Sequence, residues 1–581
     1  MKNKYGKIKK IKRITDESAK IKTLYECIQK QVYYLEKVIP EEKRFTTLLL
    51  LIEMAIRARE EQTKDPYKNR PNIIEGLNYN FLEKIQETCF DTLSFSKFTD
   101  DLFISFDESI RTITFALKHS LHKKTSTIYP LEKVEIDYLN SYVKHLVYSV
   151  AWDIAEDVES WWMIDAIDIS GGKNTTTVKV KDHIASKRLI ISNKRNLSGK
   201  RVLSNNFYKE AEKIESHSYN RRYLPPHSFW DKEEFIAAKF CAGYFSDSTL
   251  TDVYHGIKLA EWIRVYSIIR KINTNFLKNN EPCRLSLSEF CHIQEKSWWI
   301  NTFREHGLSQ ESAINIIPYL TFNSKSNDLL DAPFISDGDS IICLPTIASY
   351  IGAGHSIFSN LKSKNHISQR GDRFEEYIRK LFKHYGIASH KIKSCDAVVE
   401  IDDVLFIFEC KAYAGQYGVR DHNILFNHLL TDSVAFNKNV NGLLENLELV
   451  RKAFKKPKDW QPESIYKAFI IMGKIGQAEQ FNGCYIIDET LLTSFLKRAT
   501  FNLPNENLEE CEQHFWEYEG NVTAEKFIKL ITMPRPIEIY EAECDLQDLK
   551  MQFYSMKINY QCYLKSTPGF YIPFEREFLE L

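Results

Sequence analysis

Four charged residues near the middle of the chain occupy positions that a folded domain would partly bury. Glu375 lies in a segment with helical spacing, Asp396 opens an apolar run, and Glu409 and Lys411 close the next apolar run. Such charges are costly to bury unless they pair with something. If the two strand carboxylates converge, their oxygens suit a hard divalent cation. These residue types therefore predict a metal site with the lysine beside a water.

A helix is expected to carry Glu375. Apolar residues recur at helical spacing from Phe374 to Tyr385, and Gly386 ends the pattern. On the helical wheel Glu375 lies at the edge of the apolar face, whereas Glu376 points nearly the opposite way. Glu375 is therefore the better placed of the two acids to reach an interior site.

Two strands are expected to carry the other three residues. A strand over 397–401, a polar turn at 402–403 and a returning strand over 404–413 form a hairpin. Because side chains alternate across a strand, Glu409 and Lys411 share one face and Cys410 belongs to the other. The aspartate at the head of the first strand can approach the same place.

The order of these parts resembles the PD-(D/E)XK nuclease superfamily, which has the restriction-endonuclease-like fold. The resemblance covers roughly residues 367–499, and its matching residues are Gly371, Phe374, Glu375, Asp396, Glu409, Cys410 and Lys411. Cys395 stands where the name-giving motif has proline, a position that holds no ligand and is often replaced in the family. A Glu-x-Lys at a strand end is a weak signal alone, and the joint match is much more specific.

The resemblance implies a role for each of these residues. Asp396, Glu409 and the backbone carbonyl of Cys410 would hold Mg²⁺ or Mn²⁺. Lys411 would orient or activate a water, and Glu375 would assist the metal site. The implied reaction is in-line attack on a phosphodiester. The alternative is a charged strand terminus in an unrelated α/β domain.

The sequence after this stretch agrees with an α/β sandwich. A helix is expected over 423–454, strands over 466–472 and 484–487, and a short helix from Leu491. Together with the preceding helix and hairpin, this order predicts a mixed central sheet between layers of helices.

A basic, β-prone segment over 171–229 is the main candidate for contacts with nucleic acid. Its expected strand residues are Val178, Val180, Leu189, Ile190 and Ile191. No acidic residue occurs over 183–209, and such a local excess suits phosphates, because each neutralised phosphate releases a counterion. A merely solvated loop is the alternative. The candidate phosphate-binding residues are Lys187, Arg188, Lys194, Arg195, Lys200 and Arg201.

The chain as a whole predicts an α+β multidomain protein. The expected parts are a helical N-terminal region over 1–170, the basic segment over 171–229, a mainly helical region with a short hairpin over 230–365, the nuclease-like α/β core over 366–500 and a small C-terminal appendage over 501–581. Chemistry is expected only in the fourth part.

Composition limits the function classes. Lys+Arg and Asp+Glu both number 78, so the zero net charge gives no argument for a polyanionic partner. The 12 cysteines include no CxxC pair, so no zinc module is indicated. Residues 171–173 lack the spacing of a phosphate-binding loop, so no nucleotide-driven motor is encoded. Without a long apolar run or a signal peptide, the sequence predicts a soluble cytoplasmic protein with no membrane partner.

These observations predict a Mg²⁺-dependent endonuclease that hydrolyses DNA. A place in bacterial restriction or anti-phage defence follows by analogy with the family alone. RNA as substrate is an alternative. So is a non-catalytic nucleic-acid-binding or scaffold protein that retains the fold. A homo-oligomer or a partner protein is left open.

Overall fold

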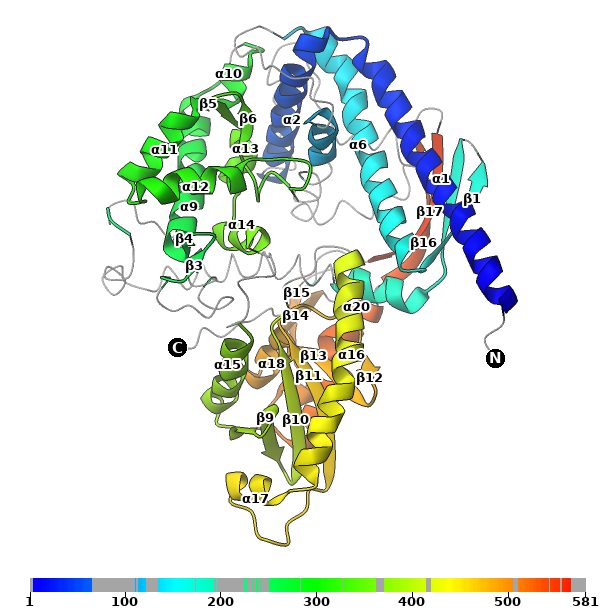
Figure 1. The fold of residues 1–581 in the computed structure, drawn as a ribbon, viewed down its shortest axis with the longest axis vertical. Coiled ribbons are helices and arrows are strands. Elements are labelled where there is room, and N and C mark those ends of the chain that lie inside the picture. The colour runs from blue at the N-terminus through cyan, green and yellow to red at the C-terminus, as the bar shows by residue number, and fades with distance from the viewer. Residues whose placement is uncertain are drawn as a thin grey trace.

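A computed structural model shows the chain as a mixed α/β protein (Figure 1). The described residues are 4–64, 110, 113–121, 134–172, 174–192, 195, 224–226, 234, 237–238, 241, 250–282, 284–326, 328–361, 370–413, 419–504, 510–542, 544–553 and 556–565. Among these residues, no helix has both the length and the apolar character needed to cross a membrane.

The described residues of the N-terminal part include three long helices, in keeping with the helical region predicted over 1–170. Leu24 and Ile28 are buried in the core that the helices share. The first two helices each pack against the third (Figure 1). The helices are α1 (Lys4–Glu36), α2 (Glu41–Lys64) and α6 (Ile136–Met163).

Residues 250–361 form a second, mainly helical part with a small sheet. The predicted hairpin is present as β6 (Ile335–Asp337) and β7 (Ser340–Cys343), and β5 (His292–Glu295) pairs with β7 to complete three strands. Gly338, with a φ of 58°, supplies the left-handed residue of the hairpin turn. The helices of this part are α9 (Leu259–Asn279), α10 (Leu287–Phe290), α11 (Lys296–Glu305), α12 (Gln310–Leu320), α13 (Pro345–Ser349) and α14 (Ala353–Asn360).

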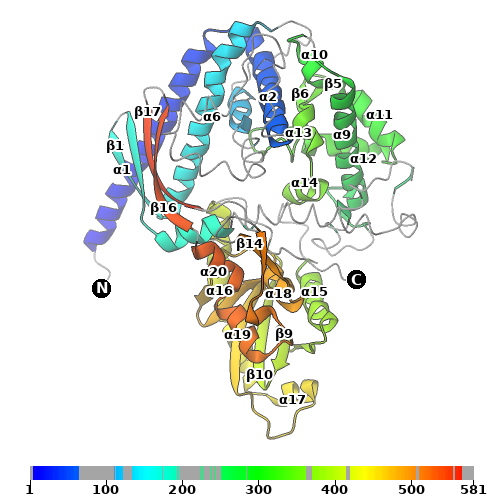
Figure 2. The same ribbon diagram turned by 180° about the vertical axis from the view of Figure 1, so that it is seen from behind.

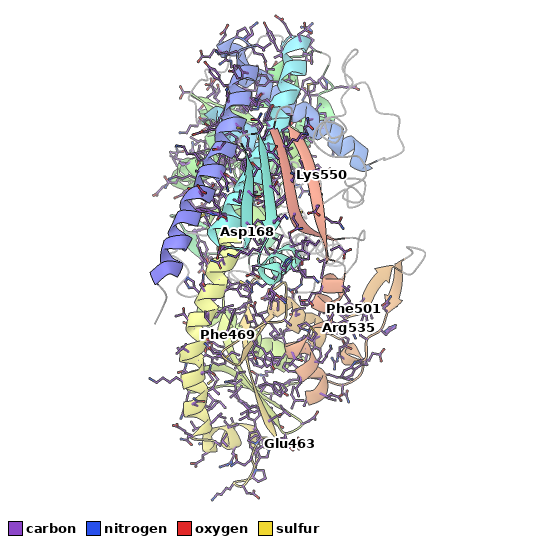
Figure 3. All side chains as sticks on the ribbon, turned by 90° about the vertical axis from the view of Figure 1, so that its right-hand side faces the viewer. Asp168, Glu463, Phe469, Phe501, Arg535 and Lys550 are labelled. Carbon is purple, nitrogen blue, oxygen red and sulfur yellow. The ribbon has the colours of Figure 1, made fainter. Side chains whose placement is uncertain are left out.

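A four-stranded sheet joins residues from the two ends of the chain. β1 (Ile167–Gly172) and β2 (Thr175–Val180) form a hairpin, which confirms the strand prediction at Val178 and Val180. β17 (Met556–Lys565) pairs with β2 in parallel, and β16 (Cys544–Phe553) completes the sheet (Figure 2). Figure 3 labels one residue in each edge strand, Asp168 and Lys550. The last part of the chain, expected as an appendage, therefore contributes half of an N-terminal sheet.

The basic segment differs from the prediction after β2. Leu189, Ile190 and Ile191 lie in a helix over residues 183–192 rather than in a strand. Asp182 caps this helix by accepting a hydrogen bond from the backbone N–H of Ala185 at 3.0 Å. The strand prediction for these three residues is wrong, because the cap and the tertiary packing of the helix outweigh their β-propensity.

A six-stranded mixed sheet forms the centre of the α/β core (residues 370–504). The predicted hairpin is present, with Asp402 and Asp403 at φ values of 49° and 60° in its tight turn. The two later strands are also present where they are predicted. In sheet order the strands are β12 (Gln480–Phe481), β13 (Cys484–Asp488), β11 (Ser464–Ile471), β10 (Val404–Lys411), β9 (Cys395–Ile401) and β8 (Ser389–Ile392).

Helices cover both faces of this sheet. α15 (Arg370–His384) and α19 (Ala524–Thr532) cover one face, where Phe382 and Phe527 pack on Phe408. α16 (Val419–Leu444) covers the other face, where Phe436 packs on Phe469, a residue labelled in Figure 3.

The helix predicted over 423–454 is divided into two. The second piece is α17 (Glu448–Phe454), and residues 445–447 separate it from α16. Asn441, Gly442 and Asn446, all poor helix formers, surround the division. The short helix predicted from Leu491 is α18 (Glu489–Leu496).

The strand ends of the core meet at one edge of the sheet. β10, β11 and β13 are parallel, and β9 runs antiparallel to β10, so β9 begins where the other three end. Lys411, Ile471 and Asp488 lie in lateral register along this edge. The turn at 402–403 lies at the opposite end, so the edge with the strand ends faces the N-terminal part (Figure 1).

Candidate active site

Asp396 is fixed at the head of β9, just beyond the last paired residues of the β9–β10 ladder. Its carboxylate Oδ2 accepts a hydrogen bond from the backbone N–H of Cys410 at 2.8 Å, across the two strands. Its own carbonyl oxygen accepts a hydrogen bond from Nη1 of Arg379 at 2.8 Å. The residue is only 7% exposed. The strand that carries Glu409 and Lys411 is therefore tied directly to the Asp396 carboxylate.

Glu409 and Lys411 share the face of β10 that α16 covers, as the alternation predicts. The Lys411 ammonium nitrogen lies 3.1 Å from Glu409 Oε1. The other carboxylate oxygen, Glu409 Oε2, is buried and has no hydrogen-bond partner among the described residues. A buried carboxylate oxygen without a partner carries an uncompensated desolvation cost, which a bound cation would offset.

Asp432 is a member of the site that sequence reasoning missed. It lies on α16, with Oδ2 3.3 Å from the Lys411 ammonium nitrogen. The hydroxyl of Tyr413 donates to the same oxygen at 2.8 Å. One signal could have found it, because Asp432 lies three residues after Leu429 and four before Phe436, two buried positions of α16. An acid at that helical spacing points toward the sheet.

Glu375 lies where the helical wheel predicts. Its side chain is 13% exposed, whereas that of Glu376 is 55% exposed. Lys391 of β8 holds the Glu375 carboxylate at 2.5 Å, and Arg379 lies 3.8 Å away on the next helical turn. The glutamate therefore enters the site as part of an ion-paired group and already has cationic partners.

The negative charges of Asp396 and Glu409 are only partly balanced by neighbouring positive groups. Burial raises the pKa of Asp396 to about 7, and the Glu409 carboxylate adds to the shift against the opposing hydrogen bond from Cys410. Burial also raises the pKa of Glu409, although Lys411 opposes this. Carboxylates in this state gain from a positive charge placed between them.

Lys411 is held as an ammonium ion. Burial alone would lower the pKa of Lys411, but Glu409 and Asp432 together raise it above its ordinary value. A lysine in this state donates hydrogen bonds and supplies positive charge, and it does not serve as a general base. Of the two roles that the family resemblance implies, orienting a water fits these contacts and activating it by proton removal does not.

The residues fit a divalent cation bound by few protein ligands. Asp396, the unpartnered oxygen of Glu409 and the backbone carbonyl of Cys410 are all oxygen donors, which Mg²⁺ prefers. Within the described ranges, no three His, Cys, Asp or Glu side chains form a group that could hold a metal. Mg²⁺ typically keeps several waters and takes one or two carboxylates together with substrate phosphates, so a two-carboxylate site suits it.

No family model, curated protein or solved structure matches this chain. These comparisons therefore add nothing to what the geometry of the site indicates about its chemistry.

Two of the basic residues predicted to contact phosphate, Arg188 and Arg195, have other partners. Arg188 pairs with Glu479 at 2.6 Å and stacks over Phe426 at 4.0 Å. Arg195 is 6% exposed and makes hydrogen bonds of 2.6 and 3.1 Å to the two carboxylate oxygens of Asp488. Lys187 is partly buried. Lys194, Lys200 and Arg201 lie outside the described residues.

Arg188 and Arg195 consequently dock the helix over 183–192 onto the α/β core. Ser192 adds a hydrogen bond of 2.7 Å from its hydroxyl to the backbone carbonyl of Lys474. The side chains of Arg188 and Arg195 are only 13% and 6% exposed and are already ion-paired, so they are poorly placed to contact a phosphate. Arg195 reaches the core at Asp488, on the same sheet edge as Lys411 and two strands away.

Proposed function

We propose that this chain is a metal-dependent nuclease of the PD-(D/E)XK kind, which hydrolyses phosphodiester bonds with DNA as its substrate. The observation that carries the proposal is the buried, unpartnered Oε2 of Glu409 beside Asp396, a second carboxylate whose pKa is raised. Lys411 contacts only one of the two oxygens of Glu409, so this pair of neighbouring carboxylates can still gain from a bound cation.

Each residue of the site would have a distinct role in the reaction. Asp396 and Glu409, with the Cys410 carbonyl, would hold the cation, which supplies charge stabilisation and activation of the nucleophile when bound. Asp396 keeps its orientation through the N–H of Cys410, so the two ligand-bearing strands cannot shift independently. This rigidity supports hydrolysis, because reaction rates depend on positioning within a fraction of an ångström.

Lys411 supplies a fixed positive charge beside the ligands. Held between Glu409 and Asp432, its ammonium group can donate to an attacking water or to a phosphate oxygen on which negative charge develops. Arg379 and Lys391 add positive charge on the α15 side of the site. The combination of two acids and these cations suits a phosphate ester better than an uncharged substrate.

The test is cleavage of plasmid DNA by the purified protein with Mg²⁺ or Mn²⁺. Wild type is compared with Asp396→Asn and Lys411→Ala, and with Glu376→Gln as a matched control, since Glu376 is exposed on the same helix as Glu375. Wild type and the control should cut, and the two site variants should lose at least a hundredfold in rate, as in the loss of a catalytic electrostatic group.

Assays with three nucleic acids distinguish DNA from RNA as the substrate. Double-stranded DNA, single-stranded DNA and RNA are offered in parallel under the same conditions. If only RNA is cleaved, RNA is the substrate instead of DNA, and the proposed active site remains supported. If all three remain intact with every protein, the hydrolytic proposal is wrong.

A further inference from the structure

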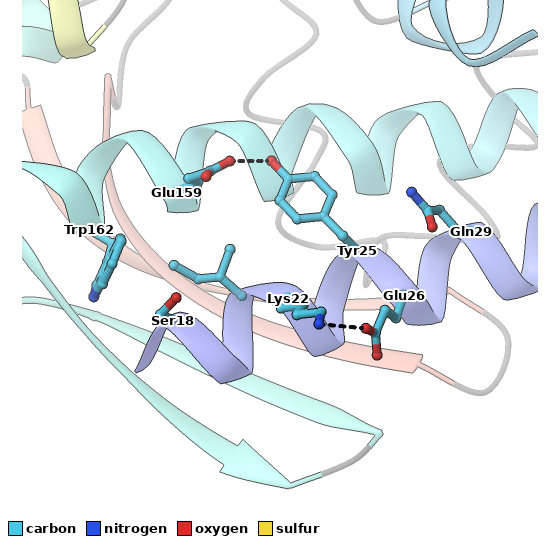
Figure 4. Close-up of a pocket in the computed structure, with 8 residues that line it drawn as sticks. Ser18, Lys22, Tyr25, Glu26, Gln29, Glu159 and Trp162 are labelled. Carbon is cyan, nitrogen blue, oxygen red and sulfur yellow. Dashed lines mark hydrogen bonds and ion pairs between the residues drawn. The ribbon is translucent and has the colours of Figure 1, made fainter. Parts of the chain in front are cut away.

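A pocket of about 360 Å³ lies between α1 and α6 (Figure 4). Both helices belong to the N-terminal part and not to the α/β core that carries the candidate active site (Figure 1). Residues of α1 from Ser18 to Gln29 line one side, a length of about 16 Å along a helix. Glu159 and Trp162 of α6 line the other side. Its volume is within the range of small-molecule sites.

The aromatic walls of this pocket are held in place by hydrogen bonds. The hydroxyl of Tyr25 donates to Glu159 Oε2 at 2.9 Å, which links the two helices across the pocket (Figure 4). The indole N–H of Trp162 donates to Glu17 Oε2 at 3.0 Å. Trp152 packs edge-on against the Tyr25 ring, with the centroids 5.9 Å apart. The pocket therefore has a defined shape before any ligand enters.

Acidic groups outnumber basic ones in the lining of the pocket, which contains Glu26, Glu159 and Lys22. Burial raises the pKa of Tyr25, and the carboxylates of Glu159, Glu156 and Asp157 raise it further, which places three acids around one ring. The one lysine in the lining, Lys22, is largely exposed and lies 3.7 Å from Glu26. Glu159 uses Oε2 for Tyr25, and no hydrogen bond to its Oε1 comes from the described residues.

Aromatic faces next to a carboxylate are the usual chemistry for an organic cation. A ring attracts an ammonium group through its quadrupole, and a carboxylate supplies a charged hydrogen bond. A bare metal ion is a poorer occupant, because the Glu159 carboxylate already accepts from Tyr25 and Glu26 lies beside Lys22, which leaves few free oxygen ligands. The lining residues extend from Ser18 to Gln29 along α1, and this arrangement favours a linear ligand over a compact one.

We propose that this pocket binds an aliphatic polyamine, with one ammonium group against Glu159 and the methylene chain along the ring of Tyr25. The proposal is independent of the nuclease activity. The probe is spermidine, titrated calorimetrically into the full-length protein at constant ionic strength. The uncharged 1,4-butanediol serves as a ligand control.

Two variants test the site in opposite directions. Glu159→Gln removes the charge but keeps an acceptor for the Tyr25 hydroxyl, and it should weaken spermidine binding at least tenfold. Gln29→Glu adds a carboxylate to the lining and should strengthen binding at least threefold. Glu445→Gln, an exposed acid outside the lining, is the matched control and should change binding less than twofold.

Several results would overturn the proposal. One is the absence of spermidine binding to the wild type at millimolar concentration. Another is an equal loss of binding in Glu159→Gln and Glu445→Gln, because this indicates attraction to overall surface charge. If Glu159→Gln does not fold, as checked by circular dichroism, Gln29→Glu decides alone, and unchanged binding in that variant contradicts the site.

Discussion

Lys411 and Asp432 are linked by an ion pair of 3.3 Å between a β-strand and the helix that crosses it. The helix thereby supplies a second carboxylate to the lysine of the candidate site, in addition to Glu409 of the strand, which lies 3.1 Å from the same nitrogen. Tyr413 donates to the Asp432 oxygen that faces the lysine. The position of Lys411 therefore depends on α16 as well as on its own strand.

Asp432→Asn should slow DNA cleavage by about tenfold, the equivalent of one charge-assisted contact of about 1.4 kcal/mol. The reason is that Lys411 loses one of the two carboxylates that orient it, while the ligands of the cation stay in place. We expect kcat to fall with little change in KM. Thr431→Ala, on the exposed side of α16, is the control and should keep wild-type kinetics. An unchanged kcat in Asp432→Asn would contradict the proposal that Asp432 positions Lys411.

Mg²⁺ or Mn²⁺ should stabilise the wild type against thermal unfolding. A ligand at a hundred times its Kd stabilises the folded state by about 2.7 kcal/mol. Glu409→Gln should abolish the shift, because it removes the carboxylate with the unpartnered oxygen. Glu376→Gln should retain it. The readout is the change in apparent Tm on adding cation, and equal shifts in all three proteins contradict the metal site whether or not the chain cuts DNA.

The local parts of the core could be predicted because they depend on short-range patterns. The face that buries Phe374 and Phe382 follows from helical spacing, and this spacing also separates Glu375 from Glu376. The β9–β10 hairpin follows from two apolar runs and a polar turn. These patterns involve residues in the same element or in two consecutive elements, so no knowledge of the tertiary fold is needed.

The remaining features depend on contacts between distant segments. β2 and β17 are far apart in the sequence and still pair, and Asn559 contacts Thr177, which precedes it by 382 positions. Arg195 meets Asp488 in the same way, so two arginines of a basic run that resembles a phosphate surface serve to dock segments within the chain. Asp432 joins the site only because α16 crosses above Lys411. Periodicity says which face of a helix is buried and not what that face meets.

The Arg195–Asp488 pair should make stability depend on acid pH. Burial alone would raise the pKa of Asp488, but Arg195 and Lys474 lower it to about 2. A carboxyl group with a depressed folded-state pKa contributes stability that is complete above its ordinary pKa and is lost as pH falls from about 4 to about 2. The contribution is about 2 kcal/mol from the shift.

Asp488→Asn tests this dependence. At neutral pH the variant should lose 3 kcal/mol or more, because Arg195 stays buried without its carboxylate (about 3–5 kcal/mol for one partner of a buried pair). Between pH 4 and pH 2 its stability should fall less steeply than that of the wild type. Urea unfolding at a series of pH values measures both effects, and parallel pH profiles for the two proteins contradict the assignment.

Gly476→Ala should loosen the docking of the helix over 183–192 onto the α/β core. A Cβ at this position would lie 1.7 Å from the carbonyl oxygen of Arg188 and 2.6 Å from the backbone nitrogen of Ser192, so two backbone segments would have to separate. The matched control is Gly442→Ala, since a Cβ there meets nothing within 4 Å and the residue lies in α16. The control should stabilise the protein by about 0.5–1 kcal/mol, the gain from replacing glycine in a helix.

Amide hydrogen exchange locates the effect of Gly476→Ala. Faster exchange is expected in the helix over 183–192 and at the contact with Asp488, while α15 and the β9–β10 hairpin keep wild-type protection. Because Asp488 lies in register with Lys411, loss of this docking should also lower DNA cleavage at saturating substrate. Unchanged exchange over 183–192 in the variant would show that the close backbone approach at Gly476 is not what holds the helix to the core.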